Sequence, residues 1–201
     1  MIRNTAQYLA DFKTAWSTSM EWITLSPVED REEQDLTDLE TVAQILDPIL
    51  NHYIEKIEHP IESIRTNCTG IHFSINHFLR QLRVPGLITI GDVCINGTPF
   101  FGTDYNILGK EILGHNDGGE NFDAHVWLTM RQGKILDLTI GPYMLAKHLG
   151  GPGFPPPDFK WIEHIYRSDR NEPGPYQLTY KPMLFGHRVL SSVLPIPSEL
   201  L

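Results

Sequence analysis

Residues 67–82 read NCTGIHFSINHFLRQL, and this stretch predicts a helix that begins at a cysteine. Its apolar residues recur at helical spacing, so at about 100° per residue they fall on one stripe. The stripe consists of Ile71, Ile75, Phe78, Leu79 and Leu82. Asn67 suits the N-cap position, which leaves Cys68 as the first helical residue with its thiol on the same stripe, toward the core.

A cysteine at the start of a helix has a specific chemical advantage. The positive end of the helix dipole favours the thiolate over the thiol, and the thiolate is the nucleophilic form. A small buried apolar residue at the same place would produce the same pattern. His72 borders the stripe and is expected to line the site, whereas Cys94 lies within an apolar stretch and is interpreted as a core residue.

The composition limits the classes of protein to consider. The 201 residues suit one domain, 1–201, with a helical N-terminal part over 1–60 and a core with C-terminal strands over 61–201. The formal charge of −9 argues against nucleic acid or an anionic membrane as partner. Residues 1–25 lack the apolar core of a signal peptide, and the two cysteines are too few for a disulfide framework. A cytoplasmic protein is therefore expected.

Three other helices are predicted. Residues 5–23 have a rough apolar face, and 37–40 read TDLE, a capping box that opens an amphipathic helix ending near residue 58, before Pro60. A short helix is expected over 142–149. The glycine- and proline-rich residues 150–157 predict a surface connection, or alternatively a polyproline ligand.

The strands and the long loop follow from turn signals and apolar runs. A strand over 87–95 is expected to turn at Asn96-Gly97 into a second strand over 98–101. Residues 102–121 hold five glycines and predict one long loop. Its polar residues 115–120 have the irregular spacing of an ordinary loop, so no metal and no other cofactor is predicted. Further strands are expected over 160–167 and 176–194.

Residues 123–130 read DAHVWLTM, and their alternation predicts which side chains share a face. The apolar residues at 124, 126, 128 and 130 lie on one face, and His125 and Trp127 lie on the other. A three-residue turn at 131–133 pairs residue 128 with 136 and 130 with 134. This register places Asp137 on the face of His125, within side-chain reach, whereas a two-residue turn would place Asp137 among the apolar residues.

The order Cys68, His125 and Asp137 is that of a nucleophile, a base and an orienting acid. A cysteine helix, a Val84-Pro85 boundary with a strand, then HVW at 125–127 and ILDLT at 135–139 resemble the transglutaminase-like superfamily, relatives of the papain fold. The resemblance covers about residues 67–140 and implies an α+β fold with the cysteine helix packed on an antiparallel sheet. It also implies that Cys68 is the nucleophile, His125 the general base and Asp137 the acid that orients it. Many relatives have a tryptophan after the cysteine, where this chain has Thr69.

The sequence therefore predicts a thiol enzyme that attacks an amide or acyl bond of a peptide, a protein or a small molecule. Asn67, His72 and Trp127 are the predicted oxyanion and substrate-binding residues, together with the backbone amide of Cys68. Hydrolysis by a peptidase or amidase is favoured because the 102–121 loop is polar enough to admit water. Acyl transfer to an amine is the first alternative, and a catalytically silent binding module with the same fold is the second. The oligomeric state stays open.

Overall fold

A central antiparallel sheet organises the molecule. The structure is a computed structural model, and it describes residues 5–22, 39–56, 67–84, 86–113, 124–149, 160–169 and 176–186. In these ranges the sheet has six strands. The strands are β1 (Leu87–Ile95), β2 (Thr98–Pro99), β3 (His125–Thr129), β4 (Ile135–Asp137), β5 (Tyr166–Arg167) and β6 (Leu178–Phe185). Their order is β2-β1-β3-β4-β5, and β6 pairs with β1.

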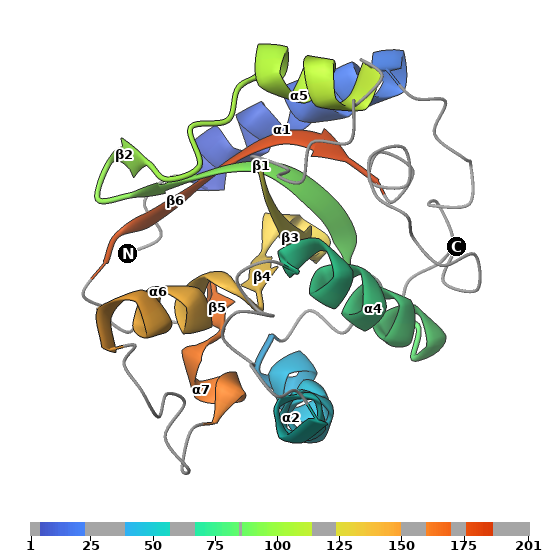
Figure 1. The fold of residues 1–201 in the computed structure, drawn as a ribbon. Coiled ribbons are helices and arrows are strands. Elements are labelled where there is room, and N and C mark those ends of the chain that lie inside the picture. The colour runs from blue at the N-terminus through green and yellow to red at the C-terminus, as the bar shows by residue number, and fades with distance from the viewer. Residues whose placement is uncertain are drawn as a thin grey trace.

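Strand β1 is the centre of this sheet because it pairs with three strands, β2, β3 and β6. Thr89 is opposite Trp127 of β3 and Phe185 of β6, and Cys94 is opposite residues of β2 and β6. Strands β3 and β2 therefore follow one another along one edge of β1, and β6 covers the other. The molecule is a mixed α+β structure with a curled antiparallel sheet, as Figure 1 shows.

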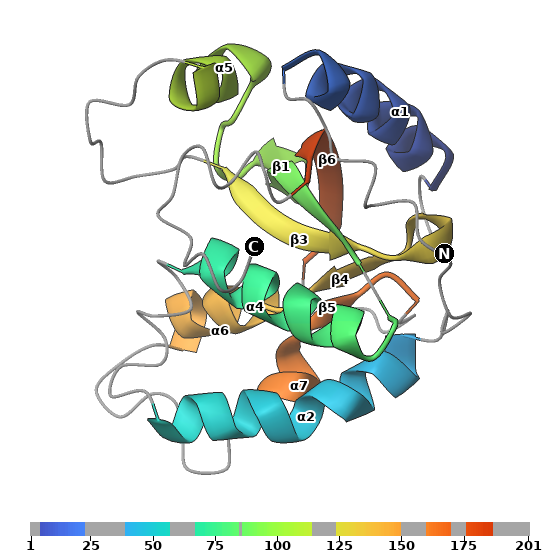
Figure 2. The ribbon, with the colours of Figure 1, turned by 90° about the vertical axis from the view of Figure 1, so that its right-hand side faces the viewer.

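Helices cover both faces of the sheet (Figures 1 and 2). The described helices are α1 (Thr5–Trp22), α2 (Leu39–Lys56), α4 (Cys68–Gln81), α5 (Tyr105–Leu113), α6 (Ile140–Leu149) and α7 (Trp161–His164), with a 3-10 turn at Arg131–Gly133. One core group joins the sheet to α2, α4, α5 and α7, and a second group joins its other face to α1 and α6. None of the described helices combines the length and apolar character needed to cross a membrane.

The predicted cysteine helix is confirmed in its start and in most of its buried face. It begins at Cys68, and the Asn67 side chain accepts a hydrogen bond from the Gly70 amide at 3.1 Å. Residue 70 is glycine for a steric reason, since a Cβ there would collide with the Asn67 side-chain oxygen. The predicted apolar stripe extends one residue too far, because Leu82 follows the last helical residue and is 41% exposed.

The register of the second hairpin is also confirmed. Leu128 is opposite Leu136, and the Met130 amide donates to the Lys134 carbonyl at 2.7 Å. Gly133 has a φ of +72°, as a three-residue turn requires. Both faces of β3 are nevertheless buried, because Val126 and Leu128 pack in one core group and Trp127 packs in the other. Burial of the second face was not expected.

The prediction of one unbroken loop over 102–121 is wrong for its first half. Residues 105–113 form helix α5, which the Asp104 carboxylate caps by accepting the amides of Asn106 and Ile107 at 2.8 and 2.9 Å. Leu108 and Ile112 reach the core and supply the burial that stabilises the helix. The loop prediction relied on the glycines of this stretch and overlooked the helical spacing of Leu108 and Ile112.

Three smaller expectations need correction. The stretch 160–167 begins as helix α7 and then forms β5. Trp161 of α7 is buried in the core, where its ring N–H donates to the Leu138 carbonyl at 2.5 Å. The second strand of the first hairpin ends at Pro99. Cys94 is half-buried, since the end of β1 lies beside the exposed β2.

Other expectations are confirmed or fall outside the described residues. Helices α1, α2 and α6, strand β1 and its turn at Asn96-Gly97 lie where predicted within a few residues. The predictions for residues 37–38 of the capping box, Pro60, 115–121, 150–157 and 187–194 lie outside the described residues.

Candidate active site

The candidate site forms where α4 and β3 begin and where β4 ends. Helix α4 packs along β3 (Figure 2). Cys68 is the first residue of α4 and His125 is the first residue of β3, and the two are close enough for Cys68 to affect the pKa of His125. The β3–β4 hairpin then returns the chain so that Asp137 lies beside His125. The structure thus brings together three residues that are separated by up to 69 positions along the chain.

His125 and Asp137 form a buried, directly bonded pair. His125 Nε2 lies 2.6 Å from Asp137 Oδ2, and the two residues are 2% and 0% exposed. Burial opposes the charged form of His125, but the Asp137 carboxylate, its hydrogen bond and the nearby Cys68 thiol raise the pKa of His125 to about 10. Burial likewise opposes the charge on Asp137, yet His125 holds the pKa of Asp137 well below its usual range. The pair is therefore an imidazolium and a carboxylate at neutral pH.

The second ring nitrogen of His125 is the one available to the thiol. Among the described residues, His125 Nδ1 has no hydrogen-bond partner of normal geometry, and the atom is buried. Cys68 is near enough to raise the pKa of His125 both as a charge and as a hydrogen-bond partner. The thiol itself is partly exposed, with the Thr69 hydroxyl 3.9 Å away. A partly exposed sulfur therefore lies beside a buried imidazole.

Asp137 is held from several directions. Its Oδ1 accepts the backbone amides of Thr139 and Ile140 at 2.9 and 3.0 Å, which caps the start of α6. Its Oδ2 also accepts a hydrogen bond from the Tyr180 hydroxyl at 2.9 Å. Burial and the charge of Asp137 raise the pKa of Tyr180 well above its usual value, so this hydroxyl stays a donor.

Two residues of this site were missed from the sequence. Tyr180 comes from β6, on the far edge of β1, and Phe101 stacks on the His125 ring with centroids 5.0 Å apart and an interplanar angle of 11°. Phe101 is positioned by Asp92, whose carboxylate accepts the amides of Phe101 and Gly102 at 3.1 Å each. Neither contact follows from local spacing. The sequence predicted only that Tyr180 lies in a strand, within 176–194, and its pairing with β1 comes from the structure.

The other predicted site residues lie in different environments. Asn67 is exposed beside the thiol, and its side-chain oxygen is used by the helix cap, which leaves its NH2 group to donate. Trp127 and His72 are both 0% exposed. The Trp127 ring N–H donates to the Tyr8 hydroxyl at 3.1 Å, within a buried cluster that includes Thr129. As placed here, neither ring presents a surface to a substrate, and substrate contact by Trp127 and His72 stays a prediction.

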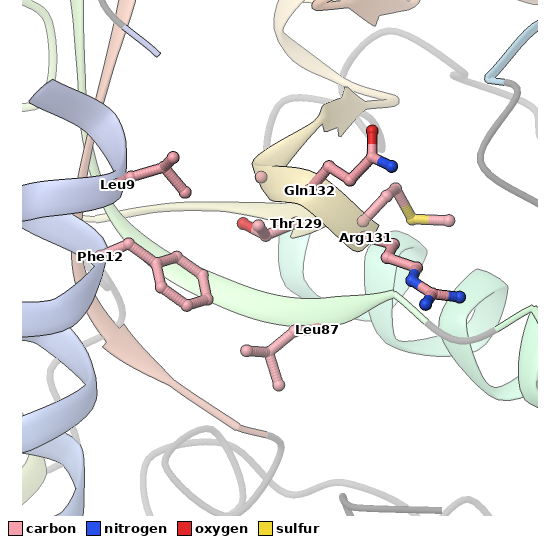
Figure 3. Close-up of a pocket in the computed structure, with 8 residues that line it drawn as sticks. Leu9, Phe12, Leu87, Thr129, Arg131 and Gln132 are labelled. Carbon is pink, nitrogen blue, oxygen red and sulfur yellow. The ribbon is translucent and has the colours of Figure 1, made fainter. Parts of the chain in front are cut away.

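A pocket of about 490 Å³ lies elsewhere, between α1 and the turn that follows β3 (Figure 3). Leu9 and Phe12 face it from α1, and Leu87 and Arg131 face it from the sheet side. Thr129 lines it at the end of β3 that is distant from His125, so this pocket is separate from the thiol site. In the described ranges no group of three or more His, Cys, Asp or Glu side chains is placed to hold a metal ion.

Comparison with known proteins adds no relative. No protein-family model, no curated protein and no solved structure matches this chain. The chemical interpretation of the site therefore depends on its own geometry.

Proposed function

We propose that this chain is a thiol enzyme that attacks an amide or acyl carbonyl through Cys68, with His125 as base and Asp137 as the acid that orients it. The observation that carries the proposal is the buried 2.6 Å contact between His125 Nε2 and Asp137 Oδ2, with Nδ1 left to the thiol. The same arrangement supports a fold similar to papain and the transglutaminase-like superfamily. A silent binding module has no need for a buried charge pair beside a partly exposed thiol.

The chemistry begins with a proton transfer from Cys68 to His125. Because Nε2–H donates to Asp137, Nδ1 is the ring nitrogen that takes the proton of the Cys68 thiol, and this transfer makes His125 an imidazolium and the sulfur a thiolate before the substrate is attacked. The sulfur then forms a bond to the substrate carbonyl carbon, and the C=O π electrons move to the oxygen. The Cys68 amide at the helix start, where amides lack an intrahelical acceptor, donates to this oxyanion with the Asn67 NH2 group.

Two further steps complete a hydrolytic cycle. The tetrahedral intermediate collapses, the bond from carbon to the leaving nitrogen breaks, and His125 gives its proton to that nitrogen. Water then attacks the thioester carbon while His125 accepts a proton from the water. The bond from this carbon to sulfur breaks, the acid leaves, and His125 returns its proton to the sulfur, which regenerates the Cys68 thiol. The covalent intermediate is an acyl thioester on Cys68.

We propose hydrolysis as the outcome, and transfer to an amine as the second candidate. The support is the polar sequence that leads into β3, with Asp117, Glu120 and Asp123 beside Asn116 and Asn121. Such a sequence favours access of water to the thioester, whereas exclusion of water favours an amine acceptor. Helix α5 shortens the polar stretch expected from the sequence, so this support comes only from residues 114–123.

The nucleophile is tested by comparing the two cysteines of the same chain. Iodoacetamide alkylation of Cys68 and Cys94 is followed by mass spectrometry across pH, and we expect Cys68 to react at least about tenfold faster at pH 6. Cys94 is the internal control because burial and the nearby Asp92 raise its pKa. Equal rates of the two cysteines at pH 6 would show that the nucleophile is wrongly assigned.

The reaction type is tested with libraries of peptides and amides. Wild type and Cys68→Ala are incubated with and without about millimolar primary amine, a concentration in the usual range for a weakly bound substrate. Free acid that is lost in Cys68→Ala supports hydrolysis. Amine conjugates in excess of acid would establish transfer, and the absence of turnover in every library would favour the binding module.

A further inference from the structure

His72 lies one turn after Cys68 on α4, and both of its ring nitrogens are occupied by backbone groups. His72 Nδ1 is 2.7 Å from the Cys68 carbonyl oxygen, and Nε2 accepts the Leu138 amide at 2.9 Å. Because Nε2 accepts a hydrogen bond from an N–H group, it carries no proton. The proton must then be on Nδ1, which donates to the Cys68 carbonyl. The contacts define one neutral tautomer.

These two hydrogen bonds connect the two halves of the thiol site. The Cys68 carbonyl belongs to the residue that carries the nucleophile, and Leu138 is the residue directly after Asp137. The Leu138 carbonyl is held in turn by the Trp161 ring N–H at 2.5 Å. His72 therefore links the first turn of α4 to a section of backbone that is fixed from both sides.

The charges around His72 explain why it must stay neutral. Its Nε2 lies 3.6 Å from Asp137 Oδ1, so Asp137 has two histidines beside it. The ionisable groups around His72 are Asp137 of β4, His125 of β3, Cys68 of α4, and Tyr180 of β6 behind the carboxylate. Complete burial, with the charge of His125, lowers the pKa of His72 to about 4 against the opposing effect of Asp137. A proton on His72 would compete with His125 for the same carboxylate.

We propose that His72 is a positioning residue of the thiol site, a neutral imidazole that ties the Cys68 turn to the Asp137–Leu138 backbone and leaves the Asp137 charge to His125. This inference rests on the proposed function. It replaces the substrate contact expected from the sequence with a role that acts through Cys68 and Asp137. A buried histidine that only filled space would stabilise the fold without affecting the alkylation rate of the thiol.

The test uses variants that differ in which hydrogen bonds they keep. His72→Phe fills the same space without either ring nitrogen, and His72→Gln offers a side-chain oxygen that can accept the Leu138 amide. His77→Phe is the matched control, because His77 lies on the same helix, is half-buried and bonds only locally to Gln81 at 3.1 Å. Thermal unfolding confirms that each variant is folded at the temperature of the assay.

The readout is the rate of Cys68 alkylation at pH 6 and at pH 10. We expect His72→Phe to lower the rate at pH 6 by about tenfold and to change the rate at pH 10 by less than about twofold. His72→Gln is expected to recover part of the loss, and His77→Phe is expected to match wild type. An unchanged ratio of the two rates in folded His72→Phe would overturn the proposal.

A second measurement keeps the proposal testable if His72→Phe does not fold. In wild type labelled with ¹⁵N-histidine, NMR should show His72 as the neutral Nδ1–H tautomer from about pH 5 to pH 8. A charged His72 at pH 6, or the Nε2–H tautomer, would overturn it. If wild-type Cys68 is unreactive at pH 6, the proposed function fails, whereas a reactive Cys68 that is indifferent to His72→Phe defeats this inference alone.

Discussion

Replacing Asp137 by asparagine removes one charge from the site and leaves the shape of the side chain. Both oxygens of Asp137 only accept hydrogen bonds. Oδ2 accepts from His125 Nε2 at 2.6 Å and from the Tyr180 hydroxyl at 2.9 Å. Oδ1 accepts the Thr139 and Ile140 amides at 2.9 and 3.0 Å and the Thr139 hydroxyl at 3.3 Å. An asparagine has one oxygen for these two sets of donors, so Asp137→Asn cannot satisfy both.

Each orientation of the new amide has a distinct cost. With its oxygen toward His125, the NH2 group faces the Thr139 and Ile140 amides, and two buried N–H groups without partners cost about 2–6 kcal/mol in unfolding free energy. With its oxygen toward those amides, the NH2 group faces His125 Nε2. That nitrogen must then accept, which moves the ring proton to Nδ1 and removes the base from the thiol.

The loss of charge has the larger effect on reactivity. Against the effect of burial, the Asp137 carboxylate raises the pKa of His125 from 6.5 to about 10, so its charge favours the imidazolium at neutral pH. Without the Asp137 charge, burial remains and lowers this pKa. The imidazolium that favours a thiolate at this position is then lost, so we expect the alkylation of Cys68 at pH 6 to slow by about a hundredfold.

The assay is the alkylation rate of Cys68 at pH 6, measured on protein that circular dichroism shows to be folded. Asp104→Asn is the matched control, because Asp104 is exposed and caps α5, a position that asparagine fills equally well. A folded Asp137→Asn protein that keeps its Cys68 rate within about threefold of wild type would refute the proposed charge pair.

Two more predictions concern stability. Asn67→Ala removes the cap hydrogen bond to Gly70 and should lower the unfolding free energy by about 1 kcal/mol. Ser74→Ala, on the exposed face of the same helix, should not lower it. Equal melting temperatures of the two variants would contradict the role of Asn67 as the cap. Because the folded-state pKa of His125 is raised from 6.5 to about 10, its contribution to stability is complete below pH 6.5 and is lost as pH rises toward 10. Urea titrations should therefore show a fall in unfolding free energy over this range, and Asp137→Asn should flatten it; an equal fall in the variant would exclude His125 as the cause.

The sequence by itself determined the local parts of the site. Residue spacing and capping chemistry place Cys68 at the start of α4, and a three-residue turn with Gly133 defines the register of β3 and β4. Asp137 then has to lie on the face of His125, because a shift by one residue would place Asp137 among the apolar side chains. These predictions are confirmed because each depends on interactions within about 15 residues of chain.

Only the tertiary structure decided what surrounds the three residues. Tyr180 reaches Asp137 from β6, and Phe101 stacks on His125 because the buried Asp92 holds its loop. His72 was expected at the surface of the site, but its hydrogen bond to Leu138 joins positions 66 residues apart. Helix α5 is stabilised by burial of Leu108 in the core. Periodicity and turn residues contain no information on such contacts, since they depend on how distant elements pack.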